Sequence, residues 1–276
     1  MGDSFTRPDY QRRGIFTRLS KAARESIIDK GVSLIYNTPN KDISLPGYIK
    51  KVNHMLVPIE LRALVKPLRV RQVLKARYHN PLLTFIASPV IEIIYTALFK
   101  IATIGIAKSD VTISPVSTFP ADVDVLWEQA SRSYDVLVVR KKEYLEWRYV
   151  TNPDAYQILI ARNLNRNVLG YIVTKIGSSG DRQVGFIVDF LTIEDDPNIF
   201  KKLLTASLEE FYRRKVSVVS TWAIKGSFYN RIFLRFGFFP PRGGGIPFLC
   251  YKNDLGSRVL STACKWHFTM GDTDNI

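Results

Sequence analysis

A basic turn that leads into an amphipathic helix is the strongest structural signal in this chain. Residues 8–16 read Pro-Asp-Tyr-Gln-Arg-Arg-Gly-Ile-Phe. Gly31 then ends the helix, and the apolar residues 32–36 predict a buried strand. Between the turn and Gly31, apolar residues recur at helical spacing, at Ile15, Leu19, Ala22, Ala23 and Ile27.

Such a turn is suited to binding an anion. The first amides of a helix have no partner within the helix, and the helix dipole favours negative charge there. Gly14 has no side chain, so a phosphate can approach the backbone closely. Arg12 and Arg13 add positive charge beside it. The turn therefore predicts a phosphate-binding site.

The turn resembles the acetyl-CoA-binding motif of the GNAT (Gcn5-related N-acetyltransferase) superfamily, Gln/Arg-x-x-Gly-x-Gly/Ala. Gln11 and Gly14 match the motif. Phe16 replaces its last small residue, so its side chain has to turn into the core. The alternative is an ordinary basic turn before a surface helix. The resemblance implies that the CoA pyrophosphate is held by Gln11, Arg12, Arg13, Gly14, Ile15, Phe16 and Thr17.

The same resemblance implies two further site residues. In GNAT enzymes a later helix often carries a tyrosine that protonates the leaving thiolate. Tyr48, in the helix expected over residues 44–51, is the candidate catalytic residue. A strict alignment with the family motif places Ile49, not Tyr48, at the position of that tyrosine. The alternative is that Tyr48 only packs in the core. Asn40 is a candidate cofactor contact or, equally, a residue that starts a helix.

Composition narrows the class of protein. The chain has 276 residues, of which 46% are apolar, enough for two folded domains. Two cysteines show neither metal-ligand spacing nor a disulfide framework, and no signal peptide precedes the turn. These features predict a cytoplasmic protein without a bound metal. His54, His79 and His267 are scattered and suggest no catalytic triad.

The net charge of +14 is concentrated near the start, where residues 1–80 hold 16 Lys or Arg against 6 Asp or Glu. This suits an anionic cofactor, and nucleic acid is the less favoured partner. Residues 56–75 are expected to be strand material, and no acid occurs between Glu60 and Glu92. Residues 82–106 are expected to form a kinked linker helix packed between domains. The alternative is peripheral contact of residues 62–77 and 82–106 with an anionic membrane surface.

From residue 111 the pattern predicts a second unit with a mixed sheet. Its order resembles a complete GNAT fold. The expected elements are a strand at 111–117, helices at 120–133 and 141–150, strands at 156–161, 168–176 and 185–193, a helix at 199–215, a strand at 216–221, a helix at 228–236 and a closing strand at 248–252.

Spacing indicates that the second unit repeats the first. Eighteen residues separate Gly14 from Val32, and eighteen separate Asn198 from Val216. Asp195 and Asp196 then occupy the place of the basic turn. Because they would repel a pyrophosphate, we expect the second copy not to bind CoA.

The second copy also contains an aromatic-rich run, Tyr-Leu-Glu-Trp-Arg-Tyr at residues 144–149, that resembles a segment of tandem GNAT proteins and of Fem-like transferases. The resemblance implies that Trp147, Arg148 and Tyr149 form a wall of the acceptor-substrate site. The alternative is a set of core aromatics with one surface arginine.

The predicted fold class is therefore α/β (α+β), with two GNAT-like mixed sheets flanked by helices, the first incomplete. Residues 1–75 form the C-terminal half of a GNAT domain, 76–110 a linker, 111–255 a degenerate second domain and 256–276 a fraying tail. A GNAT domain places several strands before the basic turn. An upstream segment, a second chain or a truncated gene would explain their absence.

The implied activity is acyl transfer from acetyl-CoA, or another acyl-CoA, to a small-molecule amine. An amino sugar or cell-envelope precursor is the acceptor that the resemblance suggests. The general base cannot be named, because the segment that should carry it is missing. The alternatives are a catalytically inactive relic or scaffold, and a protein that binds anionic surfaces.

Overall fold

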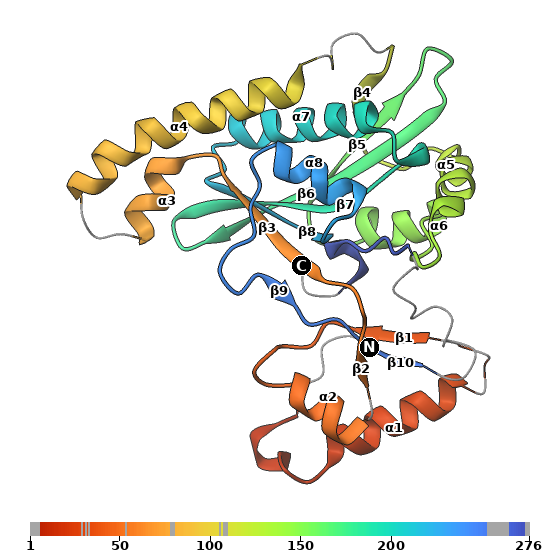
Figure 1. Ribbon diagram of the computed structural model, residues 1–276. Coiled ribbons are helices and arrows are strands. Elements are labelled where there is room, and N and C mark those ends of the chain that lie inside the picture. The colour runs from red at the N-terminus through yellow and green to blue at the C-terminus, as the bar shows by residue number, and fades with distance from the viewer. Residues whose placement is uncertain are drawn as a thin grey trace.

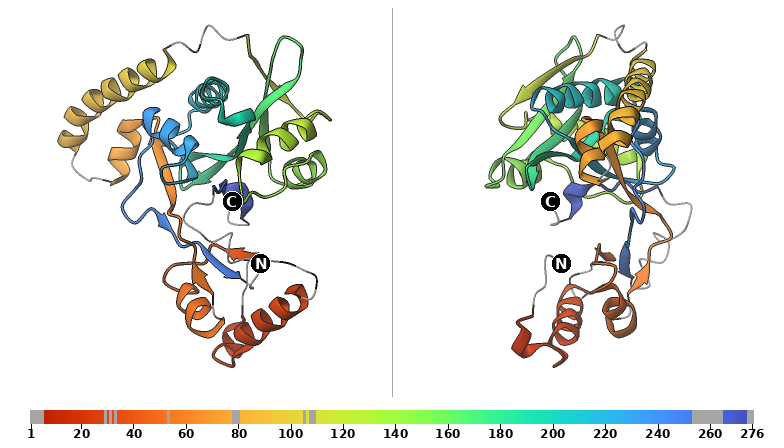
Figure 2. Two further views of the ribbon diagram at one scale, coloured as in Figure 1. Left: turned by 45° about the vertical axis from the view of Figure 1, so that its right-hand side comes forward. Right: turned by 90° about the vertical axis from the view of Figure 1, so that its left-hand side faces the viewer.

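The computed structural model describes residues 6–28, 30, 32, 34–52, 54–77, 81–104, 106, 110–252 and 265–273. They form two packed units, a smaller one around a three-stranded sheet and a larger one around a seven-stranded sheet (Figure 1). Both views in Figure 2 place the smaller unit at one end of the molecule. The expected class, mixed sheets flanked by helices, is confirmed.

The smaller unit contains the basic turn. A short 3₁₀ turn (Pro8–Tyr10) precedes it, and two helices and two strands follow it. In chain order these are α1 (Ile15–Ile28), β1 (Leu34–Asn37), α2 (Leu45–Val52) and β2 (Met55–Leu56). The helix, strand and helix predicted from the turn onward are therefore present.

The buried face of α1 differs from the predicted one. Leu19 is 58% exposed, whereas the neighbouring Ser20 is buried at 2%. The ring of Phe16 packs edge-on against Tyr48, with ring centroids 4.9 Å apart. Phe16 is the largest apolar side chain of the helix, so its burial sets the rotation of α1 and leaves Leu19 in solvent. The expectation that Phe16 turns inward is confirmed.

The larger unit has the strand order β4-β5-β6-β7-β8-β3-β9. Neighbouring strands are antiparallel, except β7 and β8, which are parallel. The order of helices and strands predicted from residue 111 to 236 is confirmed. The strands are β3 (Leu61–Pro67), β4 (Thr112–Val116), β5 (Tyr156–Arg162), β6 (Val168–Ser179), β7 (Arg182–Thr192), β8 (Val218–Ile224) and β9 (Gly245–Ile246).

Helices cover both faces of this sheet. An aromatic cluster that includes Phe190, Phe200 and Phe233 fills the core under α7 and α8. A second cluster, with Phe119 and Tyr171, fills the core on the opposite face. The helices are α5 (Val123–Ala130), α6 (Lys142–Leu145) with a π-helical turn (Glu146–Val150), α7 (Pro197–Arg213) and α8 (Phe228–Arg235).

The two units exchange strands. β10 (Leu249–Lys252) lies in the smaller sheet between β1 and β2, pairing Leu249 with Asn37 and with Leu56. In return β3 lies in the larger sheet between β8 and β9. The predicted boundaries 1–75 and 111–255 assign these strands to the opposite units. A short apolar strand can be recognised from its own residues, but its partner strand cannot. Pairing between strands about 200 residues apart leaves no pattern in the nearby sequence.

Residues 70–77 and 81–103 are helical and lie on the outside of the larger unit. α3 (Val70–Arg77) replaces the strand expected there, because Val70, Val73 and Leu74 recur at helical rather than alternating spacing. α4 (Pro81–Thr103) contains Pro89 and contacts α3, α7 and α8. The linker was expected between the two units, and this expectation is wrong (Figure 1). In the described part of the chain, no helix has both the length and the apolarity that crossing a bilayer requires.

Residues 265–273, near the end of the chain, are packed into the fold. Trp266, Phe268 and Met270 are each at most 5% exposed, and Trp266 forms a parallel bridge with Val136. Residues 265–273 therefore do not fray, contrary to expectation, and we call them the C-terminal segment. The rest of the predicted tail lies outside the described residues.

Candidate functional site

The basic turn has the geometry of an open amide cradle. Arg12 and Gly14 both have positive φ, 61° and 72°, and the first turn-to-helix bond runs from the Arg18 amide to the Gly14 carbonyl at 3.0 Å. The amides of residues 15–17 precede this bond and have no intrahelical acceptor. A Cβ built on Gly14 would meet no atom within 4 Å. The turn therefore leaves space above its backbone for a phosphate.

The turn itself carries basic side chains, of which Arg7 is paired with Asp9 at 3.2 Å. The guanidinium groups of Arg7 and Arg13 lie 5.6 and 5.0 Å from the ring centre of Tyr10. Gln11 and Arg12 are exposed, and the Gln11 side chain donates to the Thr6 carbonyl at 3.2 Å. The predicted cofactor residues 11–17 are thus adjacent and mostly solvent-facing.

Tyr48 has a packed environment. It is 6% exposed and lies between the rings of Phe16 and His54. Burial raises its pKa, and the side chain of Asn37 partly offsets this. Its hydroxyl therefore stays protonated. A proton donor must also contact the sulfur atom it protonates, so a catalytic role for Tyr48 stays a prediction.

Asn40 organises the start of α2. Its side-chain oxygen accepts from the amides of Asp42 and Ile43 at 3.0 and 3.1 Å. Its carbonyl oxygen accepts from the amides of Ser44 and Leu45. This geometry fits the alternative, a turn residue before a helix.

A small apolar pocket of about 310 Å³ lies beside β1. β1 pairs with β10 on one side, and no described strand pairs with its other edge. Leu34 and Tyr36 of β1 form one wall of the pocket, and the extended residues 136–139 form another. We call it the β1-edge pocket.

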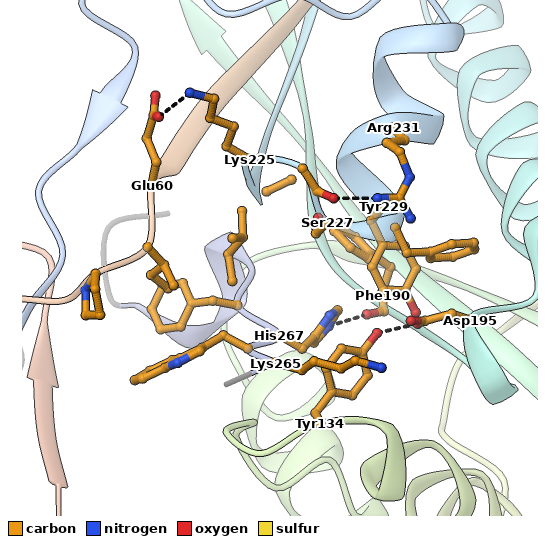
Figure 3. Close-up of a pocket in the computed structure, with 18 residues that line it drawn as sticks. Glu60, Tyr134, Phe190, Asp195, Lys225, Ser227, Tyr229, Arg231, Lys265 and His267 are labelled. Carbon is orange, nitrogen blue, oxygen red and sulfur yellow. Dashed lines mark hydrogen bonds and ion pairs between the residues drawn. The ribbon is translucent and has the colours of Figure 1, made fainter. Parts of the chain in front are cut away.

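A larger pocket of about 510 Å³ lies in the larger unit, where β7 and β8 separate (Figure 3). These strands pair only as far as Ile187 and Thr221. Glu60 and Lys225 form an ion pair of 2.8 Å at its rim. We call it the splay pocket. It shares three wall residues with the β1-edge pocket, so the C-terminal segment separates the two. The shared residues are Trp266, His267 and Phe268.

A carboxylate faces the splay pocket from a strained turn. Glu194 and Asp195 have φ of 48° and 53°, unusual for residues other than glycine. The Tyr134 hydroxyl donates to Asp195, and burial raises the pKa of this carboxyl group. Burial likewise raises the pKa of Tyr134 and Tyr229, so both hydroxyls stay protonated. Figure 3 shows these groups gathered at one end of the pocket.

His267 is a neutral, buried wall residue. Its Nε2 lies 2.9 Å from the carbonyl oxygen of Phe190. Because a carbonyl only accepts, Nε2 carries the hydrogen. Burial, reinforced by the nearby Arg140 charge, lowers the pKa of His267 well below 6.5.

At the position that the predicted repeat aligns with the basic turn, the helix-start amides are already bonded. The carboxylate of Asp196 accepts from the amides of Asn198 and Ile199, at 2.7 and 3.2 Å, and so caps α7. Asp196 thus occupies the amides that a phosphate would need, and Asp195 turns toward the splay pocket instead.

The predicted acceptor-wall residues are not brought together. Trp147 is 63% exposed, whereas Tyr149 is buried and donates to Asp189 at 3.0 Å. Arg148 donates to the carbonyl oxygens of Gly271 and Thr273. Tyr149 and Arg148 therefore support the core and the C-terminal segment, and the acceptor-wall role stays untested.

A buried ionic cluster was not predicted. Arg140 has no exposed surface and pairs with Asp189 at 3.1 Å and with Asp272 at 2.8 Å. Its Nη1 also donates to the Val138 carbonyl at 2.8 Å. The cluster fastens the C-terminal segment to β7. Its members are far apart in sequence, and no local sequence pattern predicts that they meet. Among the described residues, no group of three metal-ligating side chains gathers.

Sequence comparison finds no matching family model and no matching curated protein. Structure comparison does find similar folds. A tandem GNAT protein from the clavulanic acid biosynthesis pathway has a TM-score of 0.54 and 14% identity, over 90% of this chain and 73% of that one. A probable N-acyltransferase from Enterococcus faecalis has a TM-score of 0.56 and 13% identity, over 91% and 53%.

Saccharomyces cerevisiae N-myristoyltransferase, with bound myristoyl-CoA, has a TM-score of 0.54 and 11% identity, over 90% of this chain and 58% of that one. The chain spans little more than half the length of this enzyme and of the E. faecalis protein. At such identities the likeness concerns the fold alone. The chain has the fold of the GCN5-related N-acetyltransferases.

Proposed function

We propose that this protein is an acyl-CoA-dependent N-acyltransferase whose smaller unit binds the acyl-CoA. The observation that carries the proposal is the open amide cradle at the start of α1, within a GNAT fold. Residues 11–17 would hold the pyrophosphate through backbone amides, with Arg12 and Arg13 adding charge. The amides at the start of α7 are already bonded to Asp196, which favours a single CoA site, at the basic turn.

The two pockets suggest where the rest of the reaction takes place. The β1-edge pocket is lined mainly by apolar side chains, which suits an acyl chain beside the edge of β1 that no described strand pairs with. In the splay pocket Glu60 is already paired with Lys225, so Asp195 is the carboxylate that would accept a hydrogen bond from an amine nitrogen. In the reaction the amine nitrogen attacks the thioester carbonyl, the C–N bond forms and the C–S bond breaks. The amine loses a proton to a base, and the thiolate gains one.

Calorimetry with acetyl-CoA and with a long-chain acyl-CoA tests the cofactor site. Gly14→Glu places bulk and negative charge in the cradle, and we expect at least a tenfold loss of affinity. Gly180→Glu is the matched control, because Gly180 also has positive φ (58°) and open space around it, in the turn between β6 and β7. Absence of binding by the wild-type protein, or equal binding by both variants, would contradict the proposal.

A further inference from the structure

α4 exposes an apolar stripe on the side that faces away from the protein. Five large aliphatic residues between positions 90 and 104 are each more than half exposed. Relative to Val90 they lie three, four, eleven and fourteen residues on, which is close to a whole number of helical turns, so they share one face of the helix. The stripe consists of Val90 (57%), Ile93 (69%), Ile94 (52%), Ile101 (64%) and Ile104 (74%), the last just beyond the helix end.

The opposite side of α4 is already used for packing. Phe99 contacts the ring of Phe236, with centroids 5.9 Å apart, and Ala102 and Ile106 join the main core. At about 100° per residue, the two positions inside α4, Phe99 and Ala102, lie on the side of the helix opposite the exposed stripe. A helix that is apolar on both sides needs a second apolar environment beyond the one it packs against.

Positive charge flanks the stripe. α3, which contacts α4, exposes Arg71 and Lys75, and α4 exposes Lys100 together with one acid, Glu92. No acid occurs between Glu60 and Glu92, and the whole chain carries +14. Pairing of two copies through this face would bring like charges together, which disfavours a dimer. An anionic surface with an apolar interior matches both features.

We propose that α4 and α3 form a docking face for an anionic lipid bilayer, with the α4 stripe entering the headgroup region and the flanking cations contacting lipid phosphates. Peripheral binding of this kind needs an apolar signal and a charge signal together, and both occur here. The face lies at the opposite end of the molecule from the basic turn in both views of Figure 2. The inference is independent of the proposed acyl transfer.

Vesicle sedimentation of the full chain tests this. We expect partition onto phosphatidylcholine vesicles that contain phosphatidylglycerol, and at least tenfold weaker partition onto pure phosphatidylcholine or in 0.5 M salt. The double variant Ile93→Glu/Ile101→Glu should reduce partition at least tenfold. The matched control Ile43→Glu/Val125→Glu makes the same charge change at two residues that are 83% and 53% exposed elsewhere. It should bind within twofold of wild type.

Two results would overturn the proposal. One is a failure of the partition test, seen either as equal partition of the α4 variant and the control or as no partition of wild type onto the anionic vesicles. The other is a dimer, seen by analytical ultracentrifugation, that the α4 variant alone dissociates, because a second copy would then cover the stripe. Thermal unfolding followed by circular dichroism confirms that both variants are folded.

Discussion

Replacing Asp272 by asparagine should destabilise the protein far more than the same change at an exposed ion pair. The Asp272 carboxylate accepts from the Arg140 guanidinium at 2.8 and 2.9 Å and from the Thr269 amide at 2.8 Å. Both charged side chains are at most 1% exposed. Removing one member of a buried pair costs about 3–5 kcal/mol, since the other charge stays buried without its partner.

Two features place the expected loss near the lower end of this range. Asp189 remains beside Arg140 at 3.1 Å, and asparagine keeps an oxygen that can accept a hydrogen bond. We therefore expect the free energy of unfolding to fall by about 3 kcal/mol. The control is Asp154→Asn, which breaks the 2.8 Å pair with Lys175 at a carboxylate that is 46% exposed. Exposed pairs contribute about 0–1 kcal/mol.

Urea unfolding followed by tryptophan fluorescence measures both variants. If the C-terminal segment detaches before the rest unfolds, part of the loss will appear as local opening instead. Trypsin cleavage after Lys265, followed by mass spectrometry, detects that opening. The reasoning is refuted if Asp272→Asn is as stable as Asp154→Asn and Lys265 is equally protected in both.

Three further outcomes follow from buried groups. Gly271→Ala would place a Cβ 2.0 Å from the Tyr149 hydroxyl, so its urea midpoint should fall well below that of Gly180→Ala, which meets no atom within 4 Å. Burial lowers the pKa of Lys66 to about 8, so at pH 7 the folded protein holds a buried charge, and Lys66→Met should raise stability by about 1 kcal/mol after loss of the Nζ hydrogen bond to the Phe236 carbonyl. Urea unfolding should show this gain shrinking between pH 8 and 10.5, because the folded wild type has then lost the proton that the unfolded chain still holds, and wild-type stability rises with pH. Burial lowers the pKa of His267, so below pH 6.5 the unfolded chain takes up a proton there that the folded protein does not. The free energy of unfolding should therefore fall with decreasing pH by up to about 1.4 kcal/mol per pH unit. Urea unfolding of His267→Asn should show a weaker dependence of this free energy on pH.

Local signals account for what the sequence predicted correctly. A glycine with positive φ starts α1, apolar spacing marks α7 and α8, and alternation marks β5 and β6. The basic turn is also local, since its amides, glycine and arginines are consecutive, so the cofactor residues could be proposed from a few positions.

Contacts between distant residues account for what was missed. No pattern near Asp189 indicates that it will meet Arg140 and Asp272. One available signal was overlooked: Trp266, Phe268 and Met270 alternate, which is typical of an extended segment with one buried side. The adjacent Asp195 and Asp196 were expected to act alike, yet a single left-handed turn sends one toward the splay pocket and the other onto α7.

The strand exchange makes the smaller unit dependent on the larger one. β1 and β2 have four and two residues and do not contact each other, since β10 lies between them. Sheets this small are not stable alone. The larger unit supplies the central strand, and the C-terminal segment that follows it supplies a wall of the β1-edge pocket. The unit that carries the basic turn therefore depends on the other unit for its sheet and for the pocket beside it, even though the amides at the start of α7 are already bonded to Asp196.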